Sequence, residues 1–329
     1  MKVCIIGSTG HINYVFNGLQ QTPQAHLVGA AKGSPGETTD RLLAQASRFD
    51  IRPQIFDDYR DMLDRLRPDI VAIACHFGDH AKIAVEALQR GIHVFVEKPV
   101  ATTLQDLAKV REAYAKSGVH LAAMFGIRYT AHFLTAWHAV REGSIGQIRL
   151  LHAQKSYKLG KRAPLYHRRE TYGGTIPWVG SHAIDWLHWF SGETFESVYA
   201  SHSTRGNQDH GELEATGLCH FTMSNEVFAS ASIDYLRPAA APSHDDDRLR
   251  IAGTEGVIEV RNGCVYLING KQNGVQELPL MPAEQIFADF VRQVEQGVPC
   301  RVSAEDSFIV TEACLKARQS ADERRPVFF

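Results

Sequence analysis

Short apolar runs alternate with helix-like segments through the first third of the chain, and this alternation restricts the fold more than any other feature. The expected strands are Val3–Ile6, His26–Ala31, Ile55–Phe56, Asp69–Ala74, His93–Val96 and His120–Met124. The expected helices are Asn13–Gln21, Asp40–Arg48, Tyr59–Arg67, His80–Arg90 and Leu104–Ser117. Parallel strands need crossovers of this kind, and the helices then cover both faces of the sheet. The pattern predicts an α/β, doubly wound Rossmann domain over residues 1–124.

The rhythm changes after residue 124, where runs of period two predict strands of a largely antiparallel sheet. These runs are Gln147–Ser156, Ser197–Ser203, Ala215–Thr222, Val227–Tyr235, Arg248–Ala252, Gly256–Arg261 and Cys264–Asn269. Helical patterns cover Ala131–Glu142, Ser181–Phe190, Ala283–Gln296 and Ala304–Ala321. We therefore expect residues 125–329 to form an α+β domain whose sheet has one face covered by helices, which leaves the other face as a candidate dimer surface.

Composition excludes several classes of function. The 35 basic and 37 acidic residues give a net charge of −2, so no global field favours nucleic acid or an anionic membrane. No apolar stretch reaches the roughly 18 residues that a membrane helix needs. The six cysteines are scattered, which is typical of reduced thiols in a cytoplasmic protein.

A glycine-containing turn follows the first strand, where helix N–H groups bind phosphate in dinucleotide-binding domains. The turn contains Gly7, Ser8, Thr9, Gly10, His11 and Ile12, which we expect to hold a pyrophosphate. Gly7 fits the first glycine of G-x-G-x-x-G. Thr9 and Ile12 occupy the other two positions, and Gly10 is an extra glycine between them. The motif alone is weak, because an ordinary βα turn has the same appearance.

The second strand ends in Ala30-Ala31-Lys32-Gly33-Ser34 and carries no carboxylate for a ribose 2′-hydroxyl. Lys32 would instead pair with a 2′-phosphate, which points to NADP. A solvated surface lysine explains the residue equally well, so the sequence indicates NAD or NADP without choosing between them.

Glu97-Lys98-Pro99 follows the fifth strand, at the sheet edge where doubly wound folds bind ligands. An ammonium group there is able to hydrogen-bond a substrate hydroxyl. The preceding segment, AVEALQRGIHVFVEKP over residues 84–99, resembles the Gfo/Idh/MocA oxidoreductase family, and the resemblance covers nearly the whole chain.

The resemblance implies an NAD(P)-dependent dehydrogenase acting on the CH–OH group of a small molecule: a sugar, polyol or related hydroxy-acid. It makes Lys98 catalytic or substrate-orienting and the Lys98–Pro99 bond frequently cis. His76, Glu97 and Arg128 would line the nicotinamide side. A homodimer or homotetramer formed through the C-terminal sheet is also implied.

A second segment, GGTIPWVGSHAID over residues 173–185, resembles the family's G-G-x-x-x-D-x-G-x-H-x-x-D. The resemblance makes His182 the general base, and imidazole suits this role because it titrates near neutral pH. Asp185 also matches the pattern, and we expect it to contact substrate unless it only caps the helix or pairs structurally. Trp178 replaces the family's first aspartate, and an indole cannot accept a proton. We expect Trp178 to stack on a sugar ring or on the nicotinamide.

Two charged clusters remain. A basic loop includes Arg168 and Arg169, which would bind a substrate carboxylate or phosphate unless they are simply solvated. The run from His244 to Asp247 is expected to be a solvated loop, because consecutive carboxylates lack metal-ligand spacing. No metal is expected.

Two functions follow from these observations. The first is hydride transfer, with Lys98 orienting the oxygen and His182 exchanging the proton in a shared cleft. The second is a non-redox nucleotide sensor that keeps the dinucleotide pocket, which the replacement of aspartate by Trp178 favours.

Overall fold

The computed structural model describes residues 1–329, which form two compact units. The first contains residues 1–126, 170–173 and 285–311, and the second contains 127–169, 174–284 and 312–329. The division differs from the expected one, because residues 285–311 return to the first unit. None of the helices combines the length and the apolar composition that crossing a bilayer requires.

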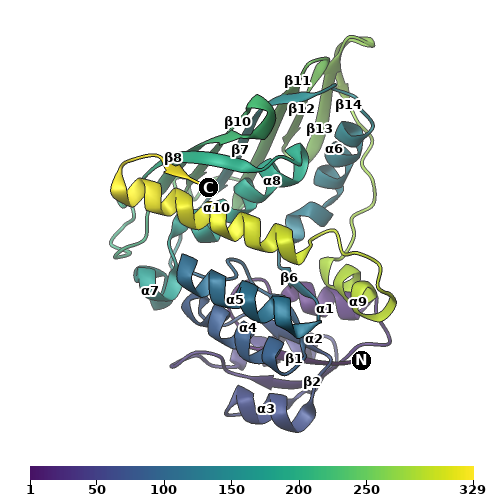
Figure 1. Ribbon diagram of the computed structural model, residues 1–329, viewed down its shortest axis with the longest axis vertical. Coiled ribbons are helices and arrows are strands. Elements are labelled where there is room, and N and C mark those ends of the chain that lie inside the picture. The colour runs from purple at the N-terminus through teal and green to yellow at the C-terminus, as the bar shows by residue number, and fades with distance from the viewer. The chain divides into compact units, whose positions relative to one another are not determined.

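The first unit is built on a six-stranded parallel sheet with the order β3-β2-β1-β4-β5-β6. Figure 1 labels β1, β2 and β6 of this sheet and the helices beside it. Its strands are β1 (Lys2–Ile6), β2 (His26–Ala31), β3 (Gln54–Phe56), β4 (Ile70–Ile73), β5 (His93–Val96) and β6 (Leu121–Ala123). Its helices are α1 (Asn13–Leu19), α2 (Asp40–Arg48), α3 (Tyr59–Leu66), α4 (His80–Gln89), α5 (Leu104–Ser117) and α9 (Ile286–Gln296). This arrangement confirms the predicted Rossmann fold.

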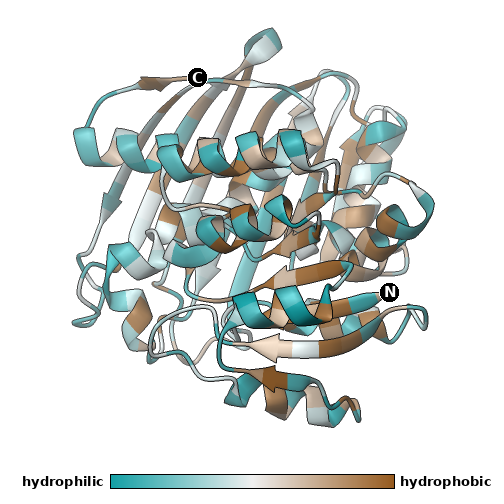
Figure 2. Cartoon of the chain, turned by 60° about the horizontal axis from the view of Figure 1, so that its bottom comes forward, coloured by the Kyte–Doolittle hydropathy of each residue, from teal (hydrophilic) through white to brown (hydrophobic).

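Burial explains why the strands read as continuous apolar runs. All four residues of β4 are buried, as are the last four of β1. The central strands are coloured mostly hydrophobic in Figure 2. A parallel sheet covered by helices on both faces has this composition. Helix ends follow local signals: the Thr103 hydroxyl accepts a hydrogen bond from Asp106 N at the start of α5, and Gly118 ends that helix with φ 68°.

The strands of this sheet end at the same level. Ile6 pairs with both Ala31 and Ile73 in register, and Val96 pairs with Ile73 and with Ala123. The residues that follow the strands therefore share one edge. The order of the strands reverses direction between β1 and β4, which is where such sheets bind their ligands.

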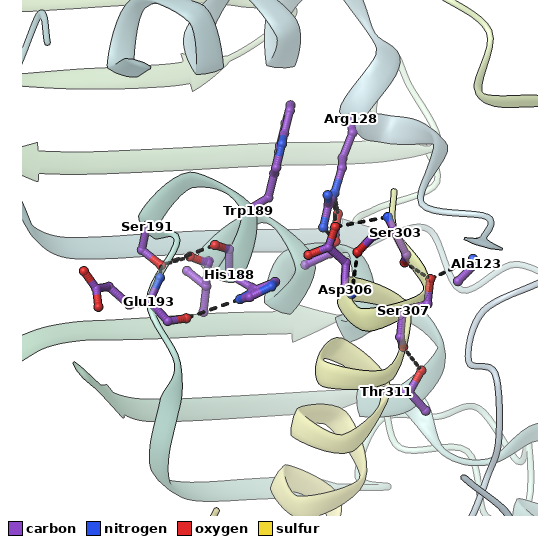
Figure 3. A network of polar contacts seen from close by, with 12 residues as sticks. Ala123, Arg128, His188, Trp189, Ser191, Glu193, Ser303, Asp306, Ser307 and Thr311 are labelled. Atoms are coloured by element: carbon purple, nitrogen blue, oxygen red, sulfur yellow. Dashed lines mark hydrogen bonds and ion pairs between the residues drawn. The ribbon is translucent and has the colours of Figure 1, made fainter. Parts of the chain in front are cut away.

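α9 explains why the first unit recruits a late segment. Its side chains Phe287 and Phe290 pack on Phe95 of β5, with ring centroids 5.2 and 5.5 Å apart. Gly18 on α1 leaves the space that Phe287 occupies, since a Cβ there would meet the Phe287 side chain. The start of the next helix belongs here too: Ser307 accepts a hydrogen bond from Ala123 N at 2.9 Å (Figure 3).

The second unit contains a nine-stranded sheet with the order β14-β13-β12-β11-β7-β10-β9-β8-β15. Its strands are β7 (Ile148–Tyr157), β8 (Phe195–Ser203), β9 (Thr216–Met223), β10 (Val227–Asp234), β11 (Asp245–Gly253), β12 (Gly256–Arg261), β13 (Cys264–Asn269), β14 (Gln272–Glu277) and β15 (Val327–Phe328). All neighbours are antiparallel except β7 and β10. The predicted antiparallel sheet is confirmed, although β14 and β15 were not predicted.

Helices α6 (Ala131–Arg141) and α8 (Ser181–Ser191) pack on this sheet, and α10 (Ala304–Glu323) contributes its residues from 312 onward. Alternate strand residues are exposed on the outer side, including Tyr199, Leu218 and Phe228. The homodimer or homotetramer expected through this sheet stays a prediction, which the molar mass in solution would check.

Two short helices precede α8 where the sequence predicted a loop. They are α7 (Arg169–Tyr172) and the π-helix η4 (Ile176–Gly180). Pro177 and Gly180 made the second segment look irregular, but proline is tolerated in a first helical turn because its missing N–H has no partner there. The π-helix runs directly into α8, so Trp178 and His182 lie on one continuous helical segment.

Candidate functional site

The glycine turn is held tightly against the loop that follows β4. Gly7 has φ 89°, and a Cβ there would lie 2.5 Å from the Ala74 carbonyl. Thr9 N donates to Ala74 O at 2.6 Å, which fixes the turn at the reversal point of the sheet. Only glycine suits this position, because the backbone is left-handed and the neighbouring chain is in contact.

Substitution of Gly7 by alanine is therefore expected to cost more than the same change at Gly36. Both glycines have positive φ, but no atom lies within 4 Å of a Cβ at Gly36. Gly36→Ala should lose about 1 kcal/mol of unfolding free energy from backbone strain alone. Gly7→Ala should lose more and weaken nucleotide binding at least about tenfold, since the turn must shift. Urea denaturation and cofactor titration check this, and equal losses in the two variants would contradict it.

A carboxylate that the sequence analysis missed binds the same turn. Glu37 is buried, and its Oε1 accepts from Ser8 N at 3.0 Å while its Oε2 accepts from Gly33 N at 3.0 Å. Glu37 lies six residues after the end of β2, in a long loop that turns back at Gly36. A search limited to the end of the strand could not find it. Residues 30–34 carry no carboxylate, but the loop that follows them brings Glu37 to this edge.

The other predicted residues of this edge have different surroundings. Lys32 is exposed, and His76 N donates to Ser34 Oγ at 3.0 Å. Arg41 of α2, which was not predicted, donates to the carbonyls of Ser8 at 3.2 Å and Gly10 at 3.0 Å. Arg41 thereby adds positive charge beside the glycine turn.

Glu97 lies under the turn from the other side. Its Oε2 accepts from His11 N at 2.7 Å, and its carboxylate also contacts His11 Nδ1 at 2.9 Å. A Cβ at Gly10 would meet this carboxylate at 2.6 Å, which explains the extra glycine. Burial alone would raise the pKa of Glu97, but the charges of His11 and Lys98 hold it below the usual value. Glu97 is thus an anion that fastens the turn to the end of β5.

Lys98 follows directly and is 1% exposed. The Lys98–Pro99 bond is cis, as the resemblance implied. His80 of α4 lies behind this turn, with Nδ1 2.9 Å from the Pro99 carbonyl. Burial lowers the pKa of His80, so its imidazole serves as a neutral brace. The structure therefore places a buried lysine at the carboxyl edge of the parallel sheet.

In the second unit, His182 and Trp178 lie within a largely aromatic region. His182 is 1% exposed and is the second residue of α8. The Trp178 ring lies 4.6 Å from Tyr166 and 6.4 Å from Tyr235, measured between centroids. The indole belongs to a cluster of rings one helical turn before the histidine, rather than to an isolated core position.

Arg128 and Asp185 form a buried ion pair in the same unit. Both are 1% exposed, and Arg128 Nη2 lies 2.5 Å from Asp185 Oδ1. The guanidinium also stacks near Trp189, 5.3 Å from the ring centroid (Figure 3). Asp185 therefore anchors Arg128 through charge, and its predicted contact with substrate stays a prediction.

Comparison with known proteins places both units in one family. A family described as "Oxidoreductase family, NAD-binding Rossmann fold" matches residues 1–125, and the "GFO/IDH/MocA C-terminal domain" matches residues 133–259. The chain belongs to the GFO/IDH/MocA oxidoreductase family. The inferred resemblance is confirmed, and so is the expectation of an NAD(P)-dependent dehydrogenase.

Three relatives show how similar other oxidoreductases are to this GFO/IDH/MocA chain. A solved putative oxidoreductase from Thermotoga maritima is 52% identical, with TM-score 0.97 and full coverage of both chains. The uncharacterized oxidoreductase YrbE of Bacillus subtilis is 30% identical over 61% of this chain and 58% of its own length. Inositol 2-dehydrogenase of Salmonella typhimurium is 23% identical over 86% of this chain and 84% of its own length.

Two expectations for this GFO/IDH/MocA protein need correction. Arg169 pairs with Glu214 at 2.6 Å and with Asp322 at 2.9 Å, so protein carboxylates occupy the guanidinium that was expected to bind substrate. Its neighbour Arg168 is exposed. Local sequence reveals a basic run but not the distant acids that fold against it.

The run from His244 to Asp247 is not a solvated loop. Asp245 begins β11, and Asp247 is 13% exposed and lies 2.5 Å from the buried Lys155 of β7. The two strands pair in register at these residues, which brings the charges together. Three consecutive acidic residues hid the alternating polar and apolar pattern that indicates a strand.

Proposed function

We propose that the protein transfers a hydride between a nicotinamide cofactor and a secondary hydroxyl or ketone of a sugar, polyol or related hydroxy-acid. Lys98 carries the proposal: it is a nearly fully buried lysine two residues after the end of β5, at the edge where this fold binds ligands. Lys98 also follows Glu97, whose carboxylate accepts a hydrogen bond from His11 N and so fastens the glycine turn. The relative named inositol 2-dehydrogenase supports a polyol-like substrate.

The residues of the first unit fit a dinucleotide. Gly7 has positive φ, and a Cβ at Gly33 would lie 2.5 Å from the Cys75 side chain. The backbone therefore passes the reversal point of the sheet with no side chain at these two positions. Ser8, Thr9, Gly10, His11 and Ile12 would hold the pyrophosphate, with His76 and Glu97 toward the nicotinamide. The cofactor supplies the hydride acceptor or donor.

The chain's own residues manage the proton and the orientation. Lys98 would donate a hydrogen bond to the reacting oxygen and stabilise negative charge that develops there. His182 would take the proton of the hydroxyl in oxidation and return it in reduction. Trp178 cannot share that task, because an indole only donates, and would instead pack on the substrate ring.

We further propose that the cofactor is NAD rather than NADP. Glu37 is a buried carboxylate beside Ser8, in the region where an acid accepts hydrogen bonds from ribose hydroxyls. A carboxylate there repels a 2′-phosphate. Lys32, which suggested NADP, is exposed to solvent and lines a cavity together with Asp57 and Asp58.

Glu37→Gln should lower the preference for NAD over NADP. The amide removes the repelling charge and turns an acceptor into a donor facing backbone N–H groups, so NAD binding also weakens. We expect the ratio of kcat/KM for NAD to that for NADP to fall about tenfold or more, the effect of one charged hydrogen bond. Asp40→Asn, which removes an exposed charge nearby, is the matched control. An unchanged ratio in Glu37→Gln would reject the assignment.

Reduced-nicotinamide absorbance with a panel of polyols, sugars and sugar acids tests the reaction itself. Turnover with NAD supports the dehydrogenase. The alternative is a nucleotide sensor without redox activity, favoured by Trp178 in place of the family aspartate. Tight cofactor binding with no turnover across the panel, together with a partner protein that binds only the loaded form, would favour the sensor.

A further inference from the structure

A guanidinium in the second unit lies among aromatic rings. The Arg162 Cζ is 4.9 Å from the Tyr235 ring centroid, 5.7 Å from that of Trp178 and 6.0 Å from that of Tyr166. Aromatic faces attract a cation and keep water from it. The arrangement holds a positive charge in a fixed place beside Trp178.

The guanidinium has hydrogen-bonding capacity that the protein does not use. Arg162 Nη2 donates to Lys158 O at 2.9 Å, while Nε is buried and no protein atom accepts its hydrogen. No carboxylate forms an ion pair with this side chain. Buried N–H groups nearly always have an acceptor, and a planar N–H fork is shaped for a carboxylate. The free donors of Arg162 therefore point to an oxyanion ligand.

Two lysines of β7 and the following loop, Lys155 and Lys158, are engaged elsewhere, unlike Arg162. Lys155 pairs with Asp247, and Lys158 Nζ donates to the backbone carbonyl of Ala239 at 2.9 Å. Burial, and after it the charge of Arg162, holds the pKa of His244 below its usual value. The field felt by this imidazole is thus positive overall, although Asp245 opposes it.

The guanidinium also lies close to the residue proposed for proton exchange. Arg162 contacts the Trp178 ring, and Trp178 precedes His182 by four residues on one continuous helical segment. Residues with this spacing share a helical face. An anion on Arg162 would be held about one helical turn from the imidazole.

We propose that Arg162, framed by Trp178 and Tyr235, binds the carboxylate of the substrate, so that the substrate is a polyhydroxy acid rather than a neutral sugar or a phosphate ester. A single guanidinium balances one negative charge, as a carboxylate carries, and a phosphate dianion needs more. The redox part of this inference rests on the proposed function, but the carboxylate site does not.

Calorimetry on the full chain saturated with NAD tests the site through matched pairs. The pairs are D-glucuronate with D-glucose, D-galacturonate with D-galactose and D-gluconate with D-sorbitol, and glucose 6-phosphate provides the phosphate arm. At least one acid should bind about 10- to 100-fold more tightly than its neutral partner, the range for hydrogen bonds to a charged group. In Arg162→Gln this preference should disappear while affinity for the neutral partner stays within about threefold.

Lys161→Gln removes an exposed charge from the adjacent position and should keep the preference. Arg162→Lys keeps the positive charge but loses the planar N–H fork, so it should keep only part of the preference for the acid. This intermediate result separates anion binding from a structural role. Three results would overturn the proposal: no acid preferred, a preference that survives in folded Arg162→Gln, or tighter binding of the phosphate ester. Acid binding without nicotinamide reduction would reject the proposed function and still support the carboxylate site.

Discussion

Lys98→Met should lower kcat by about a thousandfold and leave NAD affinity within a few fold. The lysine is 1% exposed at the end of β5, and methionine fills the same space without a charge or a donor. The variant loses the hydrogen bond to the reacting oxygen and the cation that opposes its developing charge, both of which act in the transition state. Initial rates of nicotinamide reduction, with cofactor affinity measured separately, distinguish these effects.

Lys109→Met is the control, because it removes an exposed lysine from α5 of the same unit. It should not change kcat. The variant Lys98→Met/His182→Gln tests whether both groups serve one chemical step, since residues that act as a unit show strongly non-additive losses. A double variant as active as the worse single variant would support joint action. Fully multiplied losses, or normal turnover in Lys98→Met, would contradict the assigned roles.

Lys155→Met should destabilise the second unit by about 3 kcal/mol near neutral pH. Lys155 is 1% exposed and pairs with Asp247 at 2.5 Å, so its removal leaves a buried carboxylate without its cation. Urea denaturation measures the loss. Lys271→Met, at an exposed lysine of the same unit, should have no effect, and Lys155→Met/Asp247→Leu should recover part of the stability because it removes both charges.

The destabilisation caused by Lys155→Met should be smaller at acidic pH, because of the direction in which the pKa of Asp247 is shifted. Burial, which outweighs the attraction of Lys155, holds the pKa of Asp247 above its usual value in the folded protein. The folded state therefore binds the proton more readily than the unfolded state, and this carboxyl opposes folding increasingly as pH rises through its pKa. Removing Lys155 raises that pKa further. A destabilisation that is equal at acidic and neutral pH would contradict this account.

The alternation of strands and helices was sufficient to predict the parallel sheet, because period and length are local properties. Ranges such as His26–Ala31 and His93–Val96 were predicted with their observed bounds. The sequence also located Lys98, since a residue after a parallel strand necessarily lies at the ligand-binding edge. Its burial, and the hydrogen bond by which the preceding Glu97 holds the glycine turn, needed coordinates.

What the sequence could not provide are pairings between distant segments. Glu37 reaches the glycine turn only because its loop folds back, and Arg169 meets Glu214 across 45 positions of chain. Arg162 looked like one more charge in a basic run until Tyr235 and Trp178 were seen around it. Side-chain partners depend on tertiary packing, which no local pattern records.

The return of residues 285–311 to the first unit has a consequence for biosynthesis. As the chain leaves the ribosome, the strands of the parallel sheet emerge early, but the aromatic side chains of α9 that cover β5 are translated nearly two hundred residues later. The apolar surface of the nascent coenzyme-binding half therefore stays exposed until α9 has been translated. A gene fragment ending after residue 126 should yield an aggregation-prone product.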